Sequence, residues 1–325
     1  MVDVKEIKSI ELVPFTLMTS SIGAILALIY ALILLITFGT LAAFLPGAAL
    51  IFASLGISMI ILYPIGTFLV YITLSFVTAL IYNMLVPRTG GIKLGLEGDE
   101  VKNVPVVSFA LIMSCVAAIW AFIIGLLLTA VILPLTTIVS TVIPLASQLA
   151  VAVVNNATSI LSMSNSTNLS VNATNLSAAT LPNGSAVGTG GVVLALMLII
   201  GLPIAVFVFG FIGHALAAIF YNFIIPRVGG VKLLFAPAGT AHEITSIPVV
   251  AAALALASVA TIFGIIEGII SLINGIMAGS AAMGVGSLIG NIIGSFIGTF
   301  IIVAIIALLY NYLAPRIGGV QLGLE

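Results

Sequence analysis

One acidic residue inside a long apolar run is the first group in this sequence that could do chemistry. Glu267 is the only acid expected within a membrane span. A charged group in hydrocarbon is costly, so such residues usually face a cavity or a partner. Three roles are open: a place near the outer surface at the end of its helix, an intramembrane ion or proton site, and an interhelical hydrogen bond. Gly264 and Gly268 flank it and favour close approach of another helix.

His214 is the second polar candidate inside an apolar run, on the same helix face as Tyr221. No other His or Cys lies near it in sequence, which favours a packed histidine over a metal ligand. The single cysteine, Cys115, excludes an intramolecular disulfide and a Cys-based metal cluster. We find no nucleophile–base pair and no phosphate loop, so we expect no enzyme, no metal and no cofactor.

A third candidate is a phrase, Tyr-Asn-x3-Pro-Arg-x-Gly-Gly-[Ile/Val]-x-Leu, that occurs three times, each time after a long apolar run. Its polar members are Tyr82, Asn83 and Arg88, then Tyr221, Asn222 and Arg227, and finally Tyr310, Asn311 and Arg316. Tyrosine at the end of an apolar helix belongs at the headgroup level. Proline is expected to end the helix. Arginine can reach lipid phosphate or cap the last carbonyls, and Gly-Gly permits a reversal.

Two functions are open for this phrase. It is either a structural corner that anchors and terminates a helix, or a surface on which the three copies converge to bind an anionic ligand or a partner protein. We favour the corner. The residues after each Gly-Gly alternate apolar and other side chains, which predicts short strands.

The elements that carry these residues follow from composition. Charged residues make up 5% of the chain and apolar residues 62%, whereas a soluble domain has about 25% charged residues. A spanning helix needs about 20 apolar residues. We expect helices near 14–38, 58–86, 106–133, 192–225, 248–273 and 287–314. The sequence thus predicts an all-α integral membrane protein with six transmembrane helices, paired into three repeated helical hairpins with strand-like segments after each Gly-Gly.

The repeats also share a beginning, because Lys8-Ser9-Ile10 aligns with Lys102-Asn103-Val104 and Thr245-Ser246-Ile247. The predicted units are 8–97, 102–236 and 245–325. With six spans, all eight Lys and Arg residues fall on one side. The positive-inside rule then predicts a multi-pass cell-membrane protein with both termini, and the strand-like segments, in the cytoplasm.

The second unit contains a polar, uncharged insert at 155–191, which this topology places outside the cytoplasm. It holds six Asn-x-Ser/Thr sequences, at Asn156, Asn165, Asn168, Asn172, Asn175 and Asn183. They predict a glycoprotein, although an Asn/Ser/Thr-rich loop produces such sequences by composition alone. Glycan would suit an archaeal or eukaryotic surface.

Glycines recur every four residues along the last helix, at Gly286, Gly290, Gly294 and Gly298. We expect them to mediate tight helix packing rather than to line a pore.

The two-helix unit, with a basic residue before its first span and Tyr-Asn then Gly-Gly-[Ile/Val] after its second, resembles a bacterial and archaeal transmembrane family of unknown function. Members of that family typically hold one such unit, and this chain would hold three. The resemblance implies a fold and no chemistry. We therefore expect a structural or accessory membrane protein, including as a subunit of a larger envelope complex. The alternative is a channel or transporter that uses Glu267. Expected partners are membrane lipids, other membrane subunits or further copies of the chain, and no nucleic acid.

Overall fold

The computed structural model describes residues 3–45, 47, 49–164 and 191–325. The chain forms two compact units. One combines Met1–Val116 with Gly210–Glu325, and the other is Ala117–Phe209.

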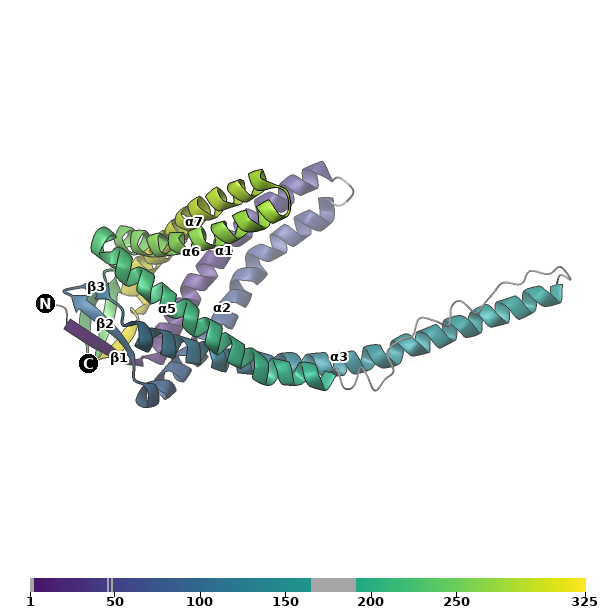
Figure 1. Ribbon diagram of the computed structural model, residues 1–325, viewed down its shortest axis with the longest axis horizontal. Coiled ribbons are helices and arrows are strands. Elements are labelled where there is room, and N and C mark those ends of the chain that lie inside the picture. The colour runs from purple at the N-terminus through teal and green to yellow at the C-terminus, as the bar shows by residue number, and fades with distance from the viewer. Residues whose placement is uncertain (1–2, 46, 48, 165–190) are drawn as a thin grey trace. The chain divides into compact units, whose positions relative to one another are not determined.

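Six helical segments in the described residues are long and apolar enough to cross a membrane. The helices are α1 (Leu12–Phe44), α2 (Ala49–Thr89), α3 (Val106–Ser164), the π-helix η3 (Met197–Gly201) continued by α5 (Leu202–Val228), α6 (Val249–Met277) and α7 (Ala281–Ile317) (Figure 1). Each candidate span overlaps one predicted helix, so the mostly helical fold with six long apolar helices is confirmed. Most helices are longer than predicted. For example, α2 has 41 residues, whereas the sequence predicted a helix only over 58–86.

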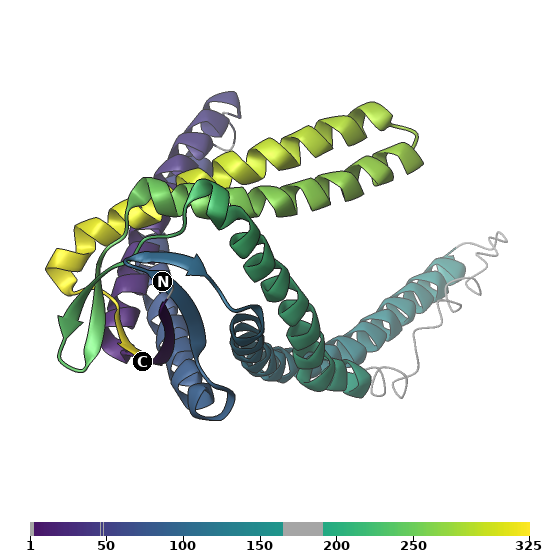
Figure 2. The same ribbon diagram turned by 60° about the vertical axis from the view of Figure 1, so that its left-hand side comes forward.

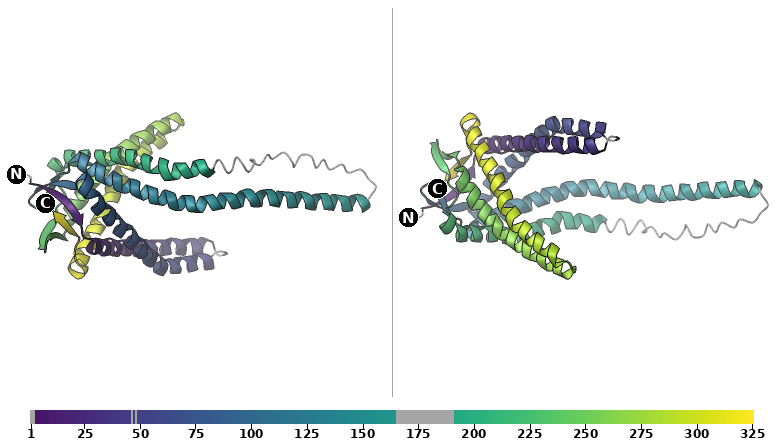
Figure 3. Two further views of the ribbon diagram at one scale, coloured as in Figure 1. Left: turned by 90° about the horizontal axis from the view of Figure 1, so that it is seen from below. Right: turned by 90° about the horizontal axis from the view of Figure 1, so that it is seen from above.

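Two of the helix pairs are tightly packed hairpins. α1 lies along α2, and α6 lies along α7 (Figures 2 and 3). The α6–α7 pair approaches closely because Gly264 and Gly268 face α7. A Cβ on Gly264 would lie 2.6 Å from the Asn291 carbonyl oxygen, and one on Gly268 would lie 3.1 Å from the Leu288 Cα. Small residues let two backbones meet in this way.

The unit Ala117–Phe209 contains α3 from Ala117 to its end at Ser164, and the π-helix. Pro203 lacks a backbone N–H and so cannot donate to carbonyls one turn back, and a π-helical turn occurs just before it. Gly125 of α3 packs on this turn, where an added Cβ would lie 2.1 Å from the Leu198 carbonyl oxygen. α3 itself continues to Ser164, so the first part of the predicted insert, 155–164, is helical.

Six short strands, all in the unit that holds both chain ends, form one antiparallel sheet. The strands are β1 (Asp3–Ile10), β2 (Ile92–Glu97), β3 (Glu100–Asn103), β4 (Leu234–Ala238), β5 (Ala241–Ser246) and β6 (Gln321–Leu324). Their order is β3-β2-β1-β6-β5-β4.

The two edges of this sheet are also connected. Val101 of β3 donates its N–H to the Val231 carbonyl at 2.8 Å, and Leu233 donates to the Asp99 carbonyl at 2.7 Å. Residues 231–233 lead directly into β4, so the strand pairings close into a ring. We call this ring the collar. Closure satisfies backbone groups that an open edge would leave unpaired.

Candidate functional site

Each Tyr-Asn pair ties the end of one helix to two strands of the collar. In the first copy, the Tyr82 hydroxyl donates to the Ile7 carbonyl at 2.7 Å and accepts the Ile92 N–H at 3.1 Å. Asn83 accepts the Ile10 N–H and donates to the Ile10 carbonyl, both at 2.8 Å. The tyrosine thus joins the strand before the first helix to the strand after the second. We call this set of contacts a strand clamp.

The same clamp occurs in the other two copies. Tyr221 donates to Val101 at 2.7 Å and accepts from Val231 at 3.0 Å, while both amide atoms of Asn222 bond to the backbone of Val104 at 2.8 Å. Tyr310 donates to Ile244 at 2.6 Å and accepts from Val320 at 2.9 Å, while Asn311 bonds to both backbone groups of Ile247 at 2.8 Å. The tyrosine hydroxyls and asparagine amides are therefore occupied by the chain's own backbone.

A glutamate completes each clamp. Glu6 accepts the Gly91 N–H at 2.6 Å, Glu100 accepts the Gly230 N–H at 2.5 Å, and Glu243 accepts the Gly319 N–H at 2.6 Å. These three glutamates were not among the candidates suggested by the sequence. The signal was available, since each stands two positions before the aligned Lys8, Lys102 and Thr245.

The environment of two of these carboxylates favours the ionised form. The Gly91 N–H, with Lys8 at 3.2 Å, holds the pKa of Glu6 below its usual value. The Gly230 N–H, with Lys102 at 2.9 Å, does the same for the pKa of Glu100. The bond to Glu100 also raises the pKa of Lys102.

The two glycines of the phrase are required for different physical reasons, one conformational and one steric. The first glycine of each copy has a positive φ, of 78° at Gly90, 92° at Gly229 and 85° at Gly318, where a side chain is strained. The second lies against the opposite strand. A Cβ on Gly91, Gly230 or Gly319 would lie 2.1–2.2 Å from the carbonyl oxygen that the clamp tyrosine binds. Both positions therefore require glycine.

The prediction that proline ends each helix is wrong by two residues. Pro87, Pro226 and Pro315 lie inside the last turns of α2, α5 and α7. The helices end at Thr89, Val228 and Ile317, directly before the positive-φ glycine, because that conformation leaves the helical path. The glycine N–H still bonds to the carbonyl four residues back, as from Gly90 to Val86 at 2.9 Å.

Two of the three phrase arginines fold back onto their own helix. Arg227 donates to the Phe223 carbonyl at 2.7 Å and lies over the Phe223 ring. Arg316 donates to the Tyr312 carbonyl and lies over the Tyr312 ring. Arg88 is exposed in the last turn of α2. The helix-capping option that the sequence suggested is thus seen at two copies, where a cation meets the negative end of the helix.

The other sequence candidates lie apart from the clamps. Glu267 is exposed on α6 and has no hydrogen-bond or ion-pair partner in the described part of the chain. His214 packs edge-on against Phe109, with ring centroids 5.9 Å apart, and its Nδ1 atom is buried without a partner. No group of three or more His, Cys, Asp or Glu residues among the described residues could hold a metal ion.

The predicted glycine stripe on α7 is not the surface that meets α6. An added Cβ on Gly286, Gly290, Gly294 or Gly298 would meet nothing within 4 Å. The glycines in the α6–α7 contact are Gly264, Gly268, Gly275 and Gly284 instead. The stripe points elsewhere because Gly284, Leu288 and Asn291 occupy the α6-facing side of the helix.

The candidate glycosylation sites fall mostly outside the described residues. Asn165, Asn168, Asn172, Asn175 and Asn183 lie there, and Asn156 is part of helix α3.

No protein-family model, curated protein or solved structure matches this chain.

Proposed function

We propose that this chain is a structural or accessory protein of the cell membrane, built from three hairpin units whose ends the collar holds in register. One observation carries the proposal: the clamps use the tyrosine hydroxyls and asparagine amides of the phrase in internal bonds. Each tyrosine hydroxyl has both a donor and an acceptor partner, and each asparagine uses its oxygen and its nitrogen. Groups that are satisfied internally are not free to recognise an anionic ligand.

Repetition of the clamp supports three equivalent units. The strand pairs have one register, since Glu6 pairs with Lys93, Glu100 with Lys232 and Glu243 with Gln321. These are the same positions of the phrase in each copy.

The packing under the collar supports a ring of units. Each clamp tyrosine belongs to a separate apolar cluster that includes the first helix of the following unit. Tyr82 packs with Ile112 of α3, Tyr221 with Val259 of α6, and Tyr310 with Met18 of α1. The last unit therefore packs on the first, as in a closed ring of three.

The charge distribution supports a cytoplasmic collar. Every Lys and Arg lies in the collar or in the last turn of a helix that enters it. We propose that both termini and the collar are cytoplasmic, and that the 155–191 insert is extracytoplasmic and glycosylated. The resemblance to the archaeal and bacterial two-helix family belongs to the same proposal, with the chain as three fused copies.

Sidedness is tested by cysteine labelling of intact cells in a Cys115→Ala background. Asp99 lies in the β2–β3 turn and Ala278 at the α6–α7 turn, and both are exposed. An impermeant maleimide should label Ala278→Cys before lysis and Asp99→Cys only afterwards. The reverse order would contradict the orientation, and labelling of both before lysis would contradict the span count.

The accessory role is tested by extracting native membranes in a mild detergent. We expect a stoichiometric membrane partner, or further copies of the chain, in an assembly well above the 33.3 kDa of one chain. Proteoliposomes of the purified protein should show no ion or proton flux. Flux that Glu267→Gln abolishes would reject the accessory role in favour of a channel or transporter.

A further inference from the structure

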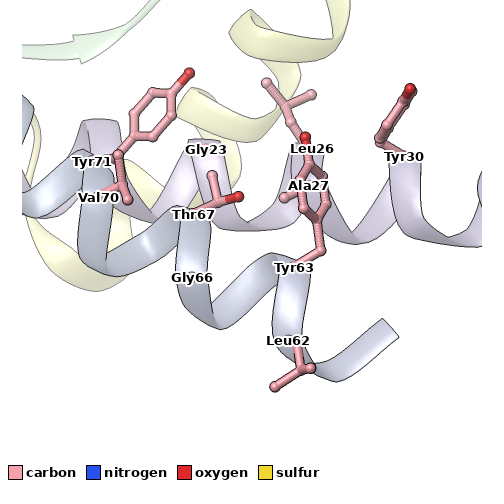
Figure 4. A pocket seen from close by; sticks show the side chains of 10 residues that line it. All are labelled: Gly23, Leu26, Ala27, Tyr30, Leu62, Tyr63, Gly66, Thr67, Val70 and Tyr71. Carbon is pink, nitrogen blue, oxygen red and sulfur yellow. The ribbon is translucent and has the colours of Figure 1, made fainter. Parts of the chain in front are cut away.

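A hollow between α1 and α2 combines polar hydroxyls with an uncharged apolar wall. Its volume is about 480 Å³, within the range of pockets that hold small molecules. Figure 4 shows the lining residues, with Tyr63 and Tyr71 rising from α2 and Tyr30 rising from α1 on the same side of the pair. The remaining wall comes mainly from Leu26, Ala27, Leu62 and Val70.

The hollow exists because small residues line it. Gly23 seats the ring of Tyr71, since a Cβ there would lie 3.1 Å from two ring atoms. Gly66 lines the hollow from α2, and a Cβ on it would meet nothing within 4 Å. The space beside Gly66 is therefore open to a ligand.

Four hydroxyls in this wall have no hydrogen-bond partner among the described residues. Tyr30, Tyr63, Tyr71 and Thr67 line the hollow, and none of their hydroxyls has a hydrogen-bond partner in the part of the chain that the structure describes. Most other Ser and Thr hydroxyls of α1 and α2 bond to their own helix, as Ser75 does to Tyr71. The lining contains no carboxylate and no amide side chain. It thus presents donors to a ligand rather than pairing them internally.

The depth of the hollow restricts what can enter. Gly23 to Tyr30 lie roughly 17–27 Å beyond the start of α1, at a helical rise of about 1.5 Å per residue. In a span that begins with α1, Gly23 lies in hydrocarbon and Tyr30 lies close to its far boundary, since the hydrocarbon core is about 30 Å thick. An unpaired hydroxyl is unfavourable in hydrocarbon, and a charged ligand is more so. This depth favours a neutral occupant that enters through the bilayer.

The rings indicate a planar group. Tyr30 and Tyr63 contact each other, with ring centroids 5.7 Å apart at 46°, and both residues remain exposed, by 50% and 40%. Their exposed aromatic surface favours offset or tilted contact with another unsaturated ring. We propose that this hollow, the tyrosine pocket, binds the headgroup of a lipid-soluble quinone, with tyrosine hydroxyls donating to its carbonyl oxygens. A quinone is uncharged, planar and acceptor-only, which matches the lining. No electron transfer is implied.

Photolabelling tests the proposal. The full-length protein in phosphatidylcholine nanodiscs is irradiated with an azido-labelled prenyl benzoquinone, with and without an excess of unlabelled prenyl benzoquinone or prenyl naphthoquinone. We expect competable label on peptides from α1 and α2. Gly66→Leu should remove it by filling the hollow, and Tyr63→Phe should weaken competition about tenfold, as for one lost hydrogen bond.

Gly39→Leu is the matched control, because Gly39 is also an exposed helical glycine with nothing within 4 Å of a Cβ. It should label as the natural chain does. The proposal fails if label is not competed, if Gly66→Leu labels like Gly39→Leu, or if diacylglycerol competes as well as the quinones. Tyr63→Phe keeps the ring, so unchanged competition in this variant would reject hydroxyl recognition.

Discussion

Gly91 lies so close to Ile7 that a Cβ on it would stand 2.1 Å from the Ile7 carbonyl oxygen. The same oxygen accepts the hydroxyl of Tyr82. The strand before the first helix is thus held between a helix end and a glycine. Gly230 and Gly319 have the same relationship to Val101 and Ile244. The second glycine of each phrase is therefore a packing requirement of the clamp and not a source of flexibility.

Gly91→Ala should destabilise the protein, because the obstacle is backbone that cannot rotate away. We expect a loss of about 1–3 kcal/mol or more, as for overpacking in a core. Gly39→Ala, in a helix with open space around it, should be neutral or slightly stabilising. Thermal unfolding in detergent measures both, and equal midpoints would contradict the clamp geometry.

Loss of one tyrosine hydroxyl should also be costly. Tyr310→Phe keeps the ring but leaves the Ile244 carbonyl and the Val320 N–H without their partner, which should cost about 1–3 kcal/mol. Tyr312→Phe is the control, since Tyr312 is 56% exposed and its ring, rather than its hydroxyl, contacts Arg316. Hydrogen exchange at the Val320 amide should accelerate in the first variant only. Equal exchange in both would show that the hydroxyl contributes nothing.

The collar should weaken in acid. The pKa values of Glu6 and Glu100 are lowered in the folded state, so their contribution is present above the unfolded-state value of about 4.3 and is lost as pH falls through the lower, folded-state pKa. Glu6→Gln with Glu100→Gln should flatten the dependence of the unfolding temperature on pH below about 4.3. Asp99→Asn, at an exposed turn, should leave that dependence unchanged. A double variant with the natural profile would contradict the assignment.

The clamps show which parts of the fold were predictable from sequence. Repetition and hydropathy located the six helices, because each is a long apolar run and each phrase marks an end. They did not reveal what Tyr82 or Asn83 binds, since both partners are backbone groups that any residue supplies. Glu6, Glu100 and Glu243 were visible as an aligned position, but their N–H partners come from glycines far along the chain.

Glycine spacing predicted two helix contacts, and the α6–α7 packing uses one of them. The regular stripe at Gly286 to Gly298 suggested a helix contact, yet the α6–α7 contact uses Gly264 and Gly268, the pair that the sequence also predicted to favour close helix approach. Both helices carry glycine at four-residue spacing, and only the rotation of each helix about its axis decides which set faces the partner. That rotation is set by tertiary packing, which the sequence pattern does not encode.

Substitutions at these two glycine sets should separate intrachain packing from self-association. Gly264→Ala should destabilise the α6–α7 hairpin, because the Asn291 carbonyl oxygen lies 2.6 Å from the new Cβ. Gly290→Ala should leave the monomer as stable as the natural chain, since nothing lies within 4 Å. If copies of the chain associate through the stripe, as the accessory role allows, Gly290→Ala should shift the population toward monomer in cross-linking and mass measurements. Two outcomes would contradict these expectations. An unchanged assembly in a chain with both Gly290→Ala and Gly294→Ala would exclude the stripe as the contact between copies. Destabilisation of the monomer by either substitution would contradict the open space around these glycines.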